Sequence, residues 1–565
     1  MICGVRMMSG SESGNYEILK QLMSKLRRID VSTPLDYIIL YTFSYKYVSD
    51  FVKDSVSLQL KNEDITMDEA YRDVDDIDNL RSYSLKNYGF FINSSESFIE
   101  EVVGNTYPQS DFLEDYLKKF PREAVFSQQH YNLNYFDEFF KAVDDEVNVS
   151  EFDEELIHDI WEIIYLISRL DIFDGEFAFG DVFNIISASR LNHRDSDPEF
   201  IIQILSHIVN SNKMSINNVY DPFLKNGDSL LAINEFGEGN LINYYGKEKN
   251  RLNYFYSMVK YFINHLPLNK LFLKNEDAFD SIDIDGASFD VILSRIPISI
   301  KNYHSSNLNQ SNEIVRRNKR SEIENLLADN LGMDGESFKE NNNLNEALQN
   351  LLEQIDLKDF NVDFTEEYQS LQDSEFLFLI NLIDSLTSDG VMAISISENF
   401  LFKNSLDLLR KYLAFEKNYI EVIIRIPTEI IRSKPEVVIV FRKNKLNTDI
   451  LFIDMTSDYS TQKSPLAYPG LFRRNLILDD ESINKMADTY VNKLTVPKYS
   501  NLVSADEIIK NNFNLSVSRY VDTFEGEFIS LEEVFREKQE IESNISELNF
   551  KIKKMMDELD IHFKQ

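Results

Sequence analysis

A strand, a loop, a helix and a second strand follow one another between residues 218 and 248, and this order constrains the fold more than any other feature. The first strand, Asn218 to Tyr220, ends in Asp221-Pro222, and the loop after it leads to a helix that we expect from Ser229. The second strand, Leu241 to Tyr245, runs into Gly246-Lys247-Glu248. Sheets that hold a nucleoside use this order, with an acidic residue after the second strand. The segment therefore predicts an α/β fold with a ligand site at the carboxyl ends of its strands.

Further apolar runs continue the α/β pattern towards the carboxyl terminus. A strand is expected over Phe289 to Leu293, and it ends in Ser294-Arg295-Ile296-Pro297-Ile298. After a long polar stretch, three more strands are expected over Val391 to Ile396, Ile420 to Ile424 and Val437 to Phe441. Continuous β-branched runs of this kind are typical of strands that are covered on both faces.

The amino-terminal 150 residues favour helices instead. Apolar residues between Ile18 and Leu26 recur at helical spacing. The stretch from Leu35 to Asp50 is apolar on all sides, which predicts a helix buried inside a small helical domain. Another helix is expected over Glu154 to Leu170, and we expect its Trp161 to lie in the core.

A final long helix is expected over Leu531 to Phe563. Its apolar residues recur close to a seven-residue repeat: Val534, Ile541, Ile545, Leu548, Ile552, Met556 and Leu559. A helix with one such stripe needs a surface to pack against. That surface is either another chain or the rest of this chain, and the sequence leaves both open.

The charge of the chain limits how it can meet nucleic acid. Its 58 Lys and Arg residues stand against 95 Asp and Glu residues, which gives a formal net charge of −37. Such a surface repels phosphate over most of its area, so binding to DNA would need a local basic patch or a basic partner. One basic cluster lies in the polar stretch: Arg316, Arg317, Lys319 and Arg320. It predicts a nucleic-acid contact or, alternatively, a solvated helix face.

Several other classes of protein are disfavoured. Cys3 is the only cysteine, so neither a disulfide framework nor a thiolate metal site is expected. The seven histidines show no ligand spacing, and we predict no metal. No apolar run approaches about 18 residues, which argues against a membrane span. Because Met1 to Gly14 lacks the apolar core of a signal peptide, we expect a cytoplasmic protein.

Two loops carry a family resemblance. The first reads Asp221-Pro222-Phe223-Leu224-Lys225-Asn226-Gly227-Asp228, and the second reads Arg295-Ile296-Pro297-Ile298. They resemble the loops Asp-Pro-Ala-Cys-Gly-Ser-Gly-Gly and Asn-Pro-Pro-Phe of the modification subunits of type I restriction systems, which are adenine-amino DNA methyltransferases. The segments Asn399 to Phe402 and Arg519-Tyr520-Val521 also resemble that family. The resemblance covers almost the whole chain and is weakest between Asn302 and Leu371.

The resemblance implies an order of domains. A helical amino-terminal domain would span residues 1–150. A methyltransferase-like α/β domain would span 151–455, with a Rossmann-like, seven-stranded class I methyltransferase sheet and a polar insertion at 302–371. A mixed segment would follow at 456–526, and a long partner-binding helix at 527–565.

The resemblance also implies S-adenosylmethionine as cofactor. Its loop would be formed by Asp221, Pro222 and Gly227, its ribose would meet Glu248, and its adenine amino group would meet Asp277. Glycines allow the backbone of such a loop to approach the ligand, and Gly227 is the only one left.

Three bulky residues, Phe223, Leu224 and Lys225, stand where the family has small ones, and Lys225 would face the cationic sulfonium. The family also places Phe-Tyr-Thr-Pro before this core, where Asp195-Ser196-Asp197-Pro198 stands here. We therefore predict weak cofactor binding or none.

The catalytic loop departs further from the family. In the family, an Asn side chain and the carbonyl of the next Pro hold the amino group of a flipped adenine, and an aromatic ring stacks on the base. Arg295 occupies the Asn position and offers only hydrogen-bond donors. Pro297 is kept, but Ile298 replaces the aromatic residue. These changes predict that methyl transfer by the family mechanism is lost.

The sequence thus favours a degenerate relative of the type I modification subunit. It would be a structural or DNA-positioning component, beside an active copy or a specificity subunit, and would contact other restriction–modification subunits through its terminal helix. Two alternatives stay open. One is an active S-adenosylmethionine-dependent adenine-amino DNA methyltransferase, and the other is a protein-interaction module that binds no nucleic acid.

Overall fold

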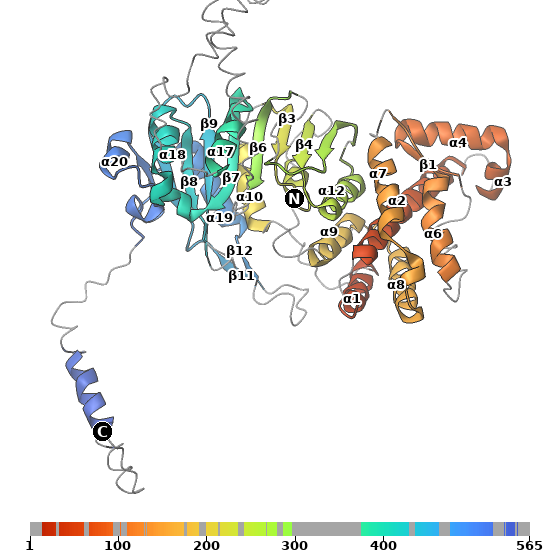
Figure 1. Cartoon of the computed structure of the whole chain (residues 1–565), viewed down its shortest axis with the longest axis horizontal. Coiled ribbons are helices and arrows are strands. Elements are labelled where there is room, and N and C mark those ends of the chain that lie inside the picture. Colours follow the sequence, from red (N-terminus) through yellow and green to blue (C-terminus); the bar gives the residue numbers. More distant parts are fainter. Residues whose placement is uncertain are drawn as a thin grey trace, which may run out of the picture.

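The chain is described from a computed structural model. The structure describes residues 14–29, 33–60, 67–93, 110–128, 133–174, 178–190, 199–212, 215–234, 242–266, 268–279, 286–296, 374–428, 435–462, 475–523 and 538–548, and the single residues 102, 130, 536 and 551. A helical part lies at one end of the molecule, and a large sheet with its covering helices lies beside it (Figure 1).

The helical part is built around one buried helix. Its elements are α1 (Gly14–Leu26), α2 (Thr33–Leu60), α3 (Met67–Arg72), α4 (Val74–Asn87), α6 (Ser110–Glu123), α7 (Leu133–Glu146), α8 (Glu154–Ser168) and α9 (Phe179–Arg190), with the antiparallel pair β1 (Phe90–Ile92) and β2 (Ala124–Phe126). Every residue of α2 from Tyr37 to Ser49 is buried, which confirms the expected buried helix. Trp161 is only half-buried, because it lies at the edge of the apolar stripe of α8 and stacks on Tyr165, so its placement in the core was wrong.

The sheet of the second part has nine strands in the described residues. They are β3 (Asn218–Asp221), β4 (Asn243–Lys247), β5 (Leu271–Lys274), β6 (Phe289–Arg295), β7 (Leu386–Ser397), β8 (Ile420–Arg425), β9 (Glu436–Arg442), β10 (Ile450–Asp454) and β13 (Ser500–Val503). The order across the sheet is β13-β10-β8-β9-β7-β6-β3-β4-β5. Neighbouring strands pair in parallel, except where β9 meets β7 and β8 and where β13 meets β10.

The α/β class is confirmed, whereas the count of seven strands is not. Two more strands extend the edge, because β10 pairs with β8 and β13 pairs with β10. Strand β13 comes from the segment expected to follow the α/β domain. Elsewhere, β4 begins two residues later than the strand expected from Leu241.

Neighbouring residues of each strand serve opposite faces of the sheet, as strand geometry requires. On one face, α17 (Ser374–Asp384), α18 (Asp407–Lys411) and α20 (Ala505–Lys510) take part in a core that contains Tyr220 and Ile292. On the other face, α10 (Glu199–Ser211), α12 (Arg251–Ile263) and α19 (Asp480–Asn492) pack on residues such as Val219 and Val391. Both faces are therefore covered, as the β-branched runs predicted.

Helix α12 joins the two parts of the molecule. Residues of the helical part and of the sheet form one continuous apolar core that includes α12. Within it, the buried carboxylate of Asp36 accepts hydrogen bonds from Arg190 Nε at 2.6 Å and from Tyr256 Oη at 3.0 Å. Burial raises the pKa of Asp36, although the bonds from Arg190 and Tyr256 act in the opposite direction.

The order of strands reverses between β3 and β6. The chain runs outward through β3, β4 and β5, and then returns to place β6 and β7 on the other side of β3. Loops after adjacent strands diverge at such a point, and ligands of doubly wound sheets bind there. The fold thus brings the two loops that carry the resemblance to one edge.

The terminal helix is described at residues 538–548. Its side chains at Ile541, Ile545 and Leu548 are 52%, 51% and 57% exposed. Figure 1 shows this helix apart from the rest of the molecule. In the part of the chain that is described, no helix combines the length and apolar character that crossing a membrane requires.

Candidate functional site

Asp221 ends β3 and organises the edge of the sheet. Its Oδ1 accepts hydrogen bonds from Phe223 N at 2.9 Å and from Ser294 Oγ at 2.7 Å, and its Oδ2 accepts one from Ser229 Oγ. The carboxylate therefore links the turn after β3, the end of β6 and the first turn of α11 (Asp228–Asn234). Pro222 is buried in the same turn.

Gly227 is required by both its conformation and its surroundings. Its φ is +80°, in the left-handed region, and a Cβ at this position would lie 2.6 Å from Tyr261 Oη and 3.0 Å from Ser257 Cβ. Both neighbours belong to α12. The glycine therefore lets the loop pass close to that helix, which is a packing role.

Leu224 fills the space over the end of β4. It is fully buried, and a Cβ built on Gly246 would lie 2.5 Å from its Cδ1. Phe223 packs instead into an aromatic cluster, with its ring centroid 5.2 Å from that of Phe279 and 5.5 Å from that of Phe378. The loop thus uses its large side chains to fill the strand edge.

Lys225 connects the two loops of the site. Its φ is +50°, and its backbone N donates to Glu248 Oε2 at 2.8 Å. Its ammonium donates to the backbone O of Arg295 at 3.1 Å, and its own carbonyl accepts from Ser257 Oγ at 3.1 Å. A residue other than glycine in this conformation costs roughly 1–2 kcal/mol, which these three bonds offset.

The acid after β4 is engaged by the backbone of the chain. Oε1 of Glu248 accepts from Asn250 N at 2.7 Å, while Oε2 accepts from Lys225 N. Glu248 was predicted to hold a ribose. A nucleoside placed here would have to compete with both backbone donors.

Asp277, after β5, is occupied in a similar way. Its Oδ2 lies 2.8 Å from Lys249 Nζ, and its Oδ1 accepts from Phe279 N at 3.1 Å. Beside it, Glu276 pairs with the fully buried Lys247 at 3.0 Å. The structure therefore places the three predicted cofactor acids, Asp221, Glu248 and Asp277, after neighbouring strands, where each carboxylate is bonded within the chain.

Arg295 ends β6 and forms a bidentate ion pair. Its Nε donates to Glu436 Oε2 at 2.9 Å, and a terminal nitrogen donates to Oε1 at 2.6 Å. Ser395 Oγ also donates to Oε2, at 2.8 Å. Glu436 begins β9 and is 1% exposed, so it is a buried anion neutralised by one guanidinium.

Sequence reasoning missed Glu436. The sequence contained a weak signal for it. Glu436 directly precedes the apolar run Val437 to Phe441, which was expected to be a buried strand, and a charge beside a buried strand needs a partner of opposite charge. Other predicted positions lie outside the described residues: Pro297, Ile298, the stretch 195–198, and the basic residues Arg316, Arg317, Lys319 and Arg320.

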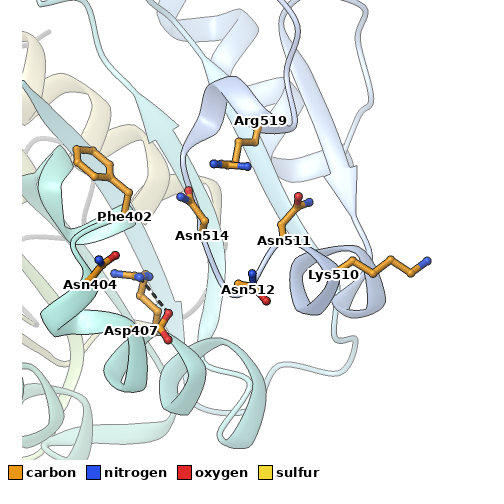
Figure 2. A pocket seen from close by; sticks show the side chains of 9 residues that line it. Phe402, Asn404, Asp407, Lys510, Asn511, Asn512, Asn514 and Arg519 are labelled. Atoms are coloured by element: carbon orange, nitrogen blue, oxygen red, sulfur yellow. Dashed lines mark hydrogen bonds and ion pairs between the residues drawn. The ribbon is translucent and has the colours of Figure 1, made fainter.

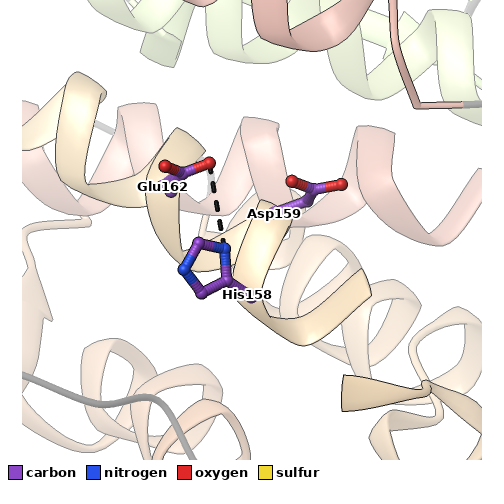
Figure 3. A group of neighbouring side chains, drawn as sticks. All are labelled: His158, Asp159 and Glu162. Carbon is purple, nitrogen blue, oxygen red and sulfur yellow. Dashed lines mark ion pairs between the residues drawn. The ribbon is translucent and has the colours of Figure 1, made fainter. Parts of the chain in front are cut away.

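A group of possible metal ligands lies elsewhere, on α8. Figure 3 shows His158, Asp159 and Glu162 on the surface of this helix, with His158 Nδ1 3.9 Å from Glu162 Oε2. The carboxylate of Glu162 also accepts a hydrogen bond from the ammonium of Lys25. That ammonium already supplies the positive charge, so pairing of surface charges accounts for the group.

Comparisons with known proteins agree with this architecture. The model of the N-6 DNA methylase family matches residues 349–527. The chain is 23% identical to the type I restriction enzyme MpnII methylase subunit of Mycoplasma pneumoniae, over 98% of this chain and 97% of that protein. It is 34% identical to the MjaVII methylase subunit of Methanocaldococcus jannaschii, over 24% of this chain and 23% of the relative.

Solved structures share the fold over most of the chain. The type I restriction-modification methyltransferase subunit of Streptococcus thermophilus superposes with a TM-score of 0.66 at 20% identity, covering 90% of this chain and 99% of that one. A modification subunit of a putative type I restriction enzyme from Vibrio vulnificus gives 0.51 at 12% identity, covering 88% and 94%. With the matching family model and the full-length sequence relative, this makes the chain similar in sequence and in fold to the modification subunits of type I restriction–modification systems.

Proposed function

We propose that this chain is a modification-family subunit that does not transfer methyl groups and that positions DNA within a restriction–modification assembly. The observation that carries the proposal is the set of bonds around Lys225. The backbone N–H of this residue donates to the carboxylate of Glu248, and its ammonium donates to the backbone carbonyl of Arg295. The acid expected to meet the ribose and the residue at the Asn position of the family motif are therefore both bonded to this one lysine.

The loop after β3 does not fit S-adenosylmethionine. The ribose would have to share the Glu248 carboxylate with the backbone N–H groups of Lys225 and Asn250. The ammonium of Lys225 would also repel a sulfonium. Leu224 packs against Gly246, where a ligand would need the backbone to be bare. Each of these features disfavours binding of S-adenosylmethionine.

The end of β6 does not fit the chemistry of the family. Activation of an adenine amino group needs acceptors for its two hydrogens, and a guanidinium has none. The side chain of Arg295 is held by Glu436, and its carbonyl accepts from Lys225. We derive no catalytic step at this position.

The partners that we propose are DNA and other restriction–modification subunits, including a specificity subunit. The exposed side chains Ile541, Ile545 and Leu548 lie four and three residues apart, the spacing of a coiled-coil seam. We assign the contact with another subunit to this helix. The basic cluster around Arg316 stays a predicted DNA contact.

The test is calorimetric titration of the purified chain with S-adenosylmethionine, followed by a labelled-methyl transfer assay on DNA. We expect no binding heat and no transfer. The variant carrying Leu224→Ala and Lys225→Gly should bind more tightly than the unchanged chain, because it opens the loop. Micromolar binding by the unchanged chain together with methyl transfer to DNA would overturn the proposal.

One observation favours the alternative of an active methyltransferase. Asn226 is fully buried in the loop after β3, and neither polar atom of its side chain has a hydrogen-bond partner among the described residues. A buried unpaired amide costs about 1–3 kcal/mol, and a bound ligand could satisfy it. Methyl transfer that is lost on Glu248→Ala would establish this alternative.

A further inference from the structure

A hollow of about 360 Å³ lies between two segments that are far apart in the sequence. One segment follows β7 and leads into α18. The other follows α20 and ends in the short helix η7 (Val517–Arg519). One wall contains Phe402, from the motif Asn399 to Phe402, and the other contains Arg519, from the motif Arg519-Tyr520-Val521 (Figure 2). Both motifs resemble the family, but neither belongs to the loops after β3 and β6.

Hydrogen bonds join the two segments that form the walls of the hollow. Leu515 N donates to the backbone O of Leu401 at 2.9 Å. The buried guanidinium of Arg410 donates through Nε to the carbonyl of Phe513 at 2.9 Å, and through a terminal nitrogen to those of Phe400 at 3.1 Å and Lys403 at 2.8 Å. The hollow is therefore a built feature of the fold.

The hollow carries net positive charge. Arg410 is balanced by Asp407, with which it forms an ion pair at 3.1 Å. Arg519 and Lys510 also line the hollow, and neither makes a side-chain hydrogen bond or ion pair within the described residues. Two cations thus lack an anion here, in a chain whose formal net charge is −37.

The remaining lining is amide and aromatic. Figure 2 shows Arg519 reaching over the hollow between Asn511 and Asn514, with Phe402 across from them. Asn404 and Asn512 line it as well, and the Phe402 ring is 44% exposed. Guanidinium and amide N–H groups are common partners of phosphate oxygens, and an exposed ring provides a surface on which a base can stack.

We propose that this hollow binds a nucleic-acid strand, with a phosphate at Arg519 and a base against Phe402. An acidic peptide would use the same cations but would have no need of the ring. The proposal rests on the DNA-positioning role proposed above. It gives that role a candidate site among the described residues.

The test measures binding of a fluorescent ten-nucleotide thymidine strand to the full chain at low salt and across a salt series. Arg519→Gln should weaken binding about five- to tenfold and lower the slope of log affinity against log salt by about one. Arg519→Lys should keep the slope. Phe402→Ala should weaken binding about tenfold with no change in slope, because it removes stacking and no charge.

The matched control is Arg169→Gln. Arg169 is exposed at the end of α8, and its loss changes the net charge by the same amount. Both variants should fold, because neither guanidinium makes a hydrogen bond or ion pair in the part of the chain that is described. Melting temperatures check this.

If Arg519→Gln and Arg169→Gln have the same affinity and the same salt slope, the hollow is not the binding site. If the unchanged chain still binds the strand in that case, the proposed DNA-positioning role stands. Displacement of the strand by a ten-residue glutamate peptide at equal concentration would overturn the nucleic-acid assignment. No binding of the strand by the unchanged chain would overturn the inference as well. The proposal that methyl transfer is lost is tested separately, by titration with S-adenosylmethionine.

Discussion

The edge at β3 and β6 and the hollow beside α18 contrast in how their charges are used. At the edge, Lys225, Glu248 and Arg295 are bonded to groups of the same chain. In the hollow, the guanidinium of Arg519 has no anion from the described residues, and the side chain of Lys510 at the rim extends outward (Figure 2). Charges that a protein satisfies internally hold it together, whereas charges that it leaves open are available to a ligand. By this criterion we propose that the edge is structural and that the hollow is a binding surface.

The largest expected effect concerns the buried ion pair at the edge. Glu436→Ala leaves the guanidinium of Arg295 without its anion, and should lower the free energy of unfolding by about 3–5 kcal/mol. Denaturant titration measures this. The double variant Arg295→Met with Glu436→Leu removes both charges and should recover most of the loss. A loss below about 1 kcal/mol for Glu436→Ala would show that the pair does not stabilise the edge.

The next effect separates two arginines of the hollow. Arg410→Met leaves three backbone carbonyls without their donor and should lower the free energy of unfolding by about 2–4 kcal/mol. Arg519→Met in the same hollow should change it by less than about 0.5 kcal/mol. Denaturant midpoints of the two variants provide the comparison. A large loss for Arg519→Met would mean that Arg519 is also structural.

A smaller effect distinguishes crowding from backbone strain. Gly227 and Gly286 both have a positive φ, +80° and +73°, but a Cβ would collide with Tyr261 at the first and meet nothing within 4 Å at the second. Gly227→Ala should therefore be about 1–3 kcal/mol more destabilising than Gly286→Ala. Thermal unfolding of both variants measures the difference. Equal losses would show that the loop after β3 can move away from α12.

The smallest effect is a dependence on pH at a half-buried cation, Lys445. Lys445 donates to the carbonyl of Ile420 at 2.8 Å, and burial lowers the pKa of its ammonium from 10.5 to about 8. Between about pH 8 and 10.5 the ammonium of Lys445 keeps its proton in the unfolded chain but loses it in the folded chain. The contribution of Lys445 to stability therefore rises as the pH increases through this window. The free energy of unfolding of wild type minus that of Lys445→Gln should rise by about 1–2 kcal/mol across this window, which is less than the full pKa shift implies because water screens the half-buried ammonium. A flat difference would contradict the shift.

Much of the fold could be predicted from short stretches of sequence. The apolar run from Val437 to Phe441 forms most of β9, and Phe289 to Leu293 lies within β6. The stretch after Leu35, which is apolar on all sides, is a buried helix. These features depend on side-chain periodicity within one segment. The two added strands β10 and β13 could not be foreseen in the same way, because their place depends on pairing at the edge of the sheet.

The candidate site was predictable in position but not in its bonding. The sequence by itself determined that Asp221, Glu248 and Arg295 follow strands, and hence that they would share an edge. Only the tertiary structure decided their partners, because Lys225 and Arg295 are 70 residues apart, and Arg295 and Glu436 are 141 residues apart. Periodicity carries information over a few residues, whereas an ion pair depends on where distant backbone segments come together.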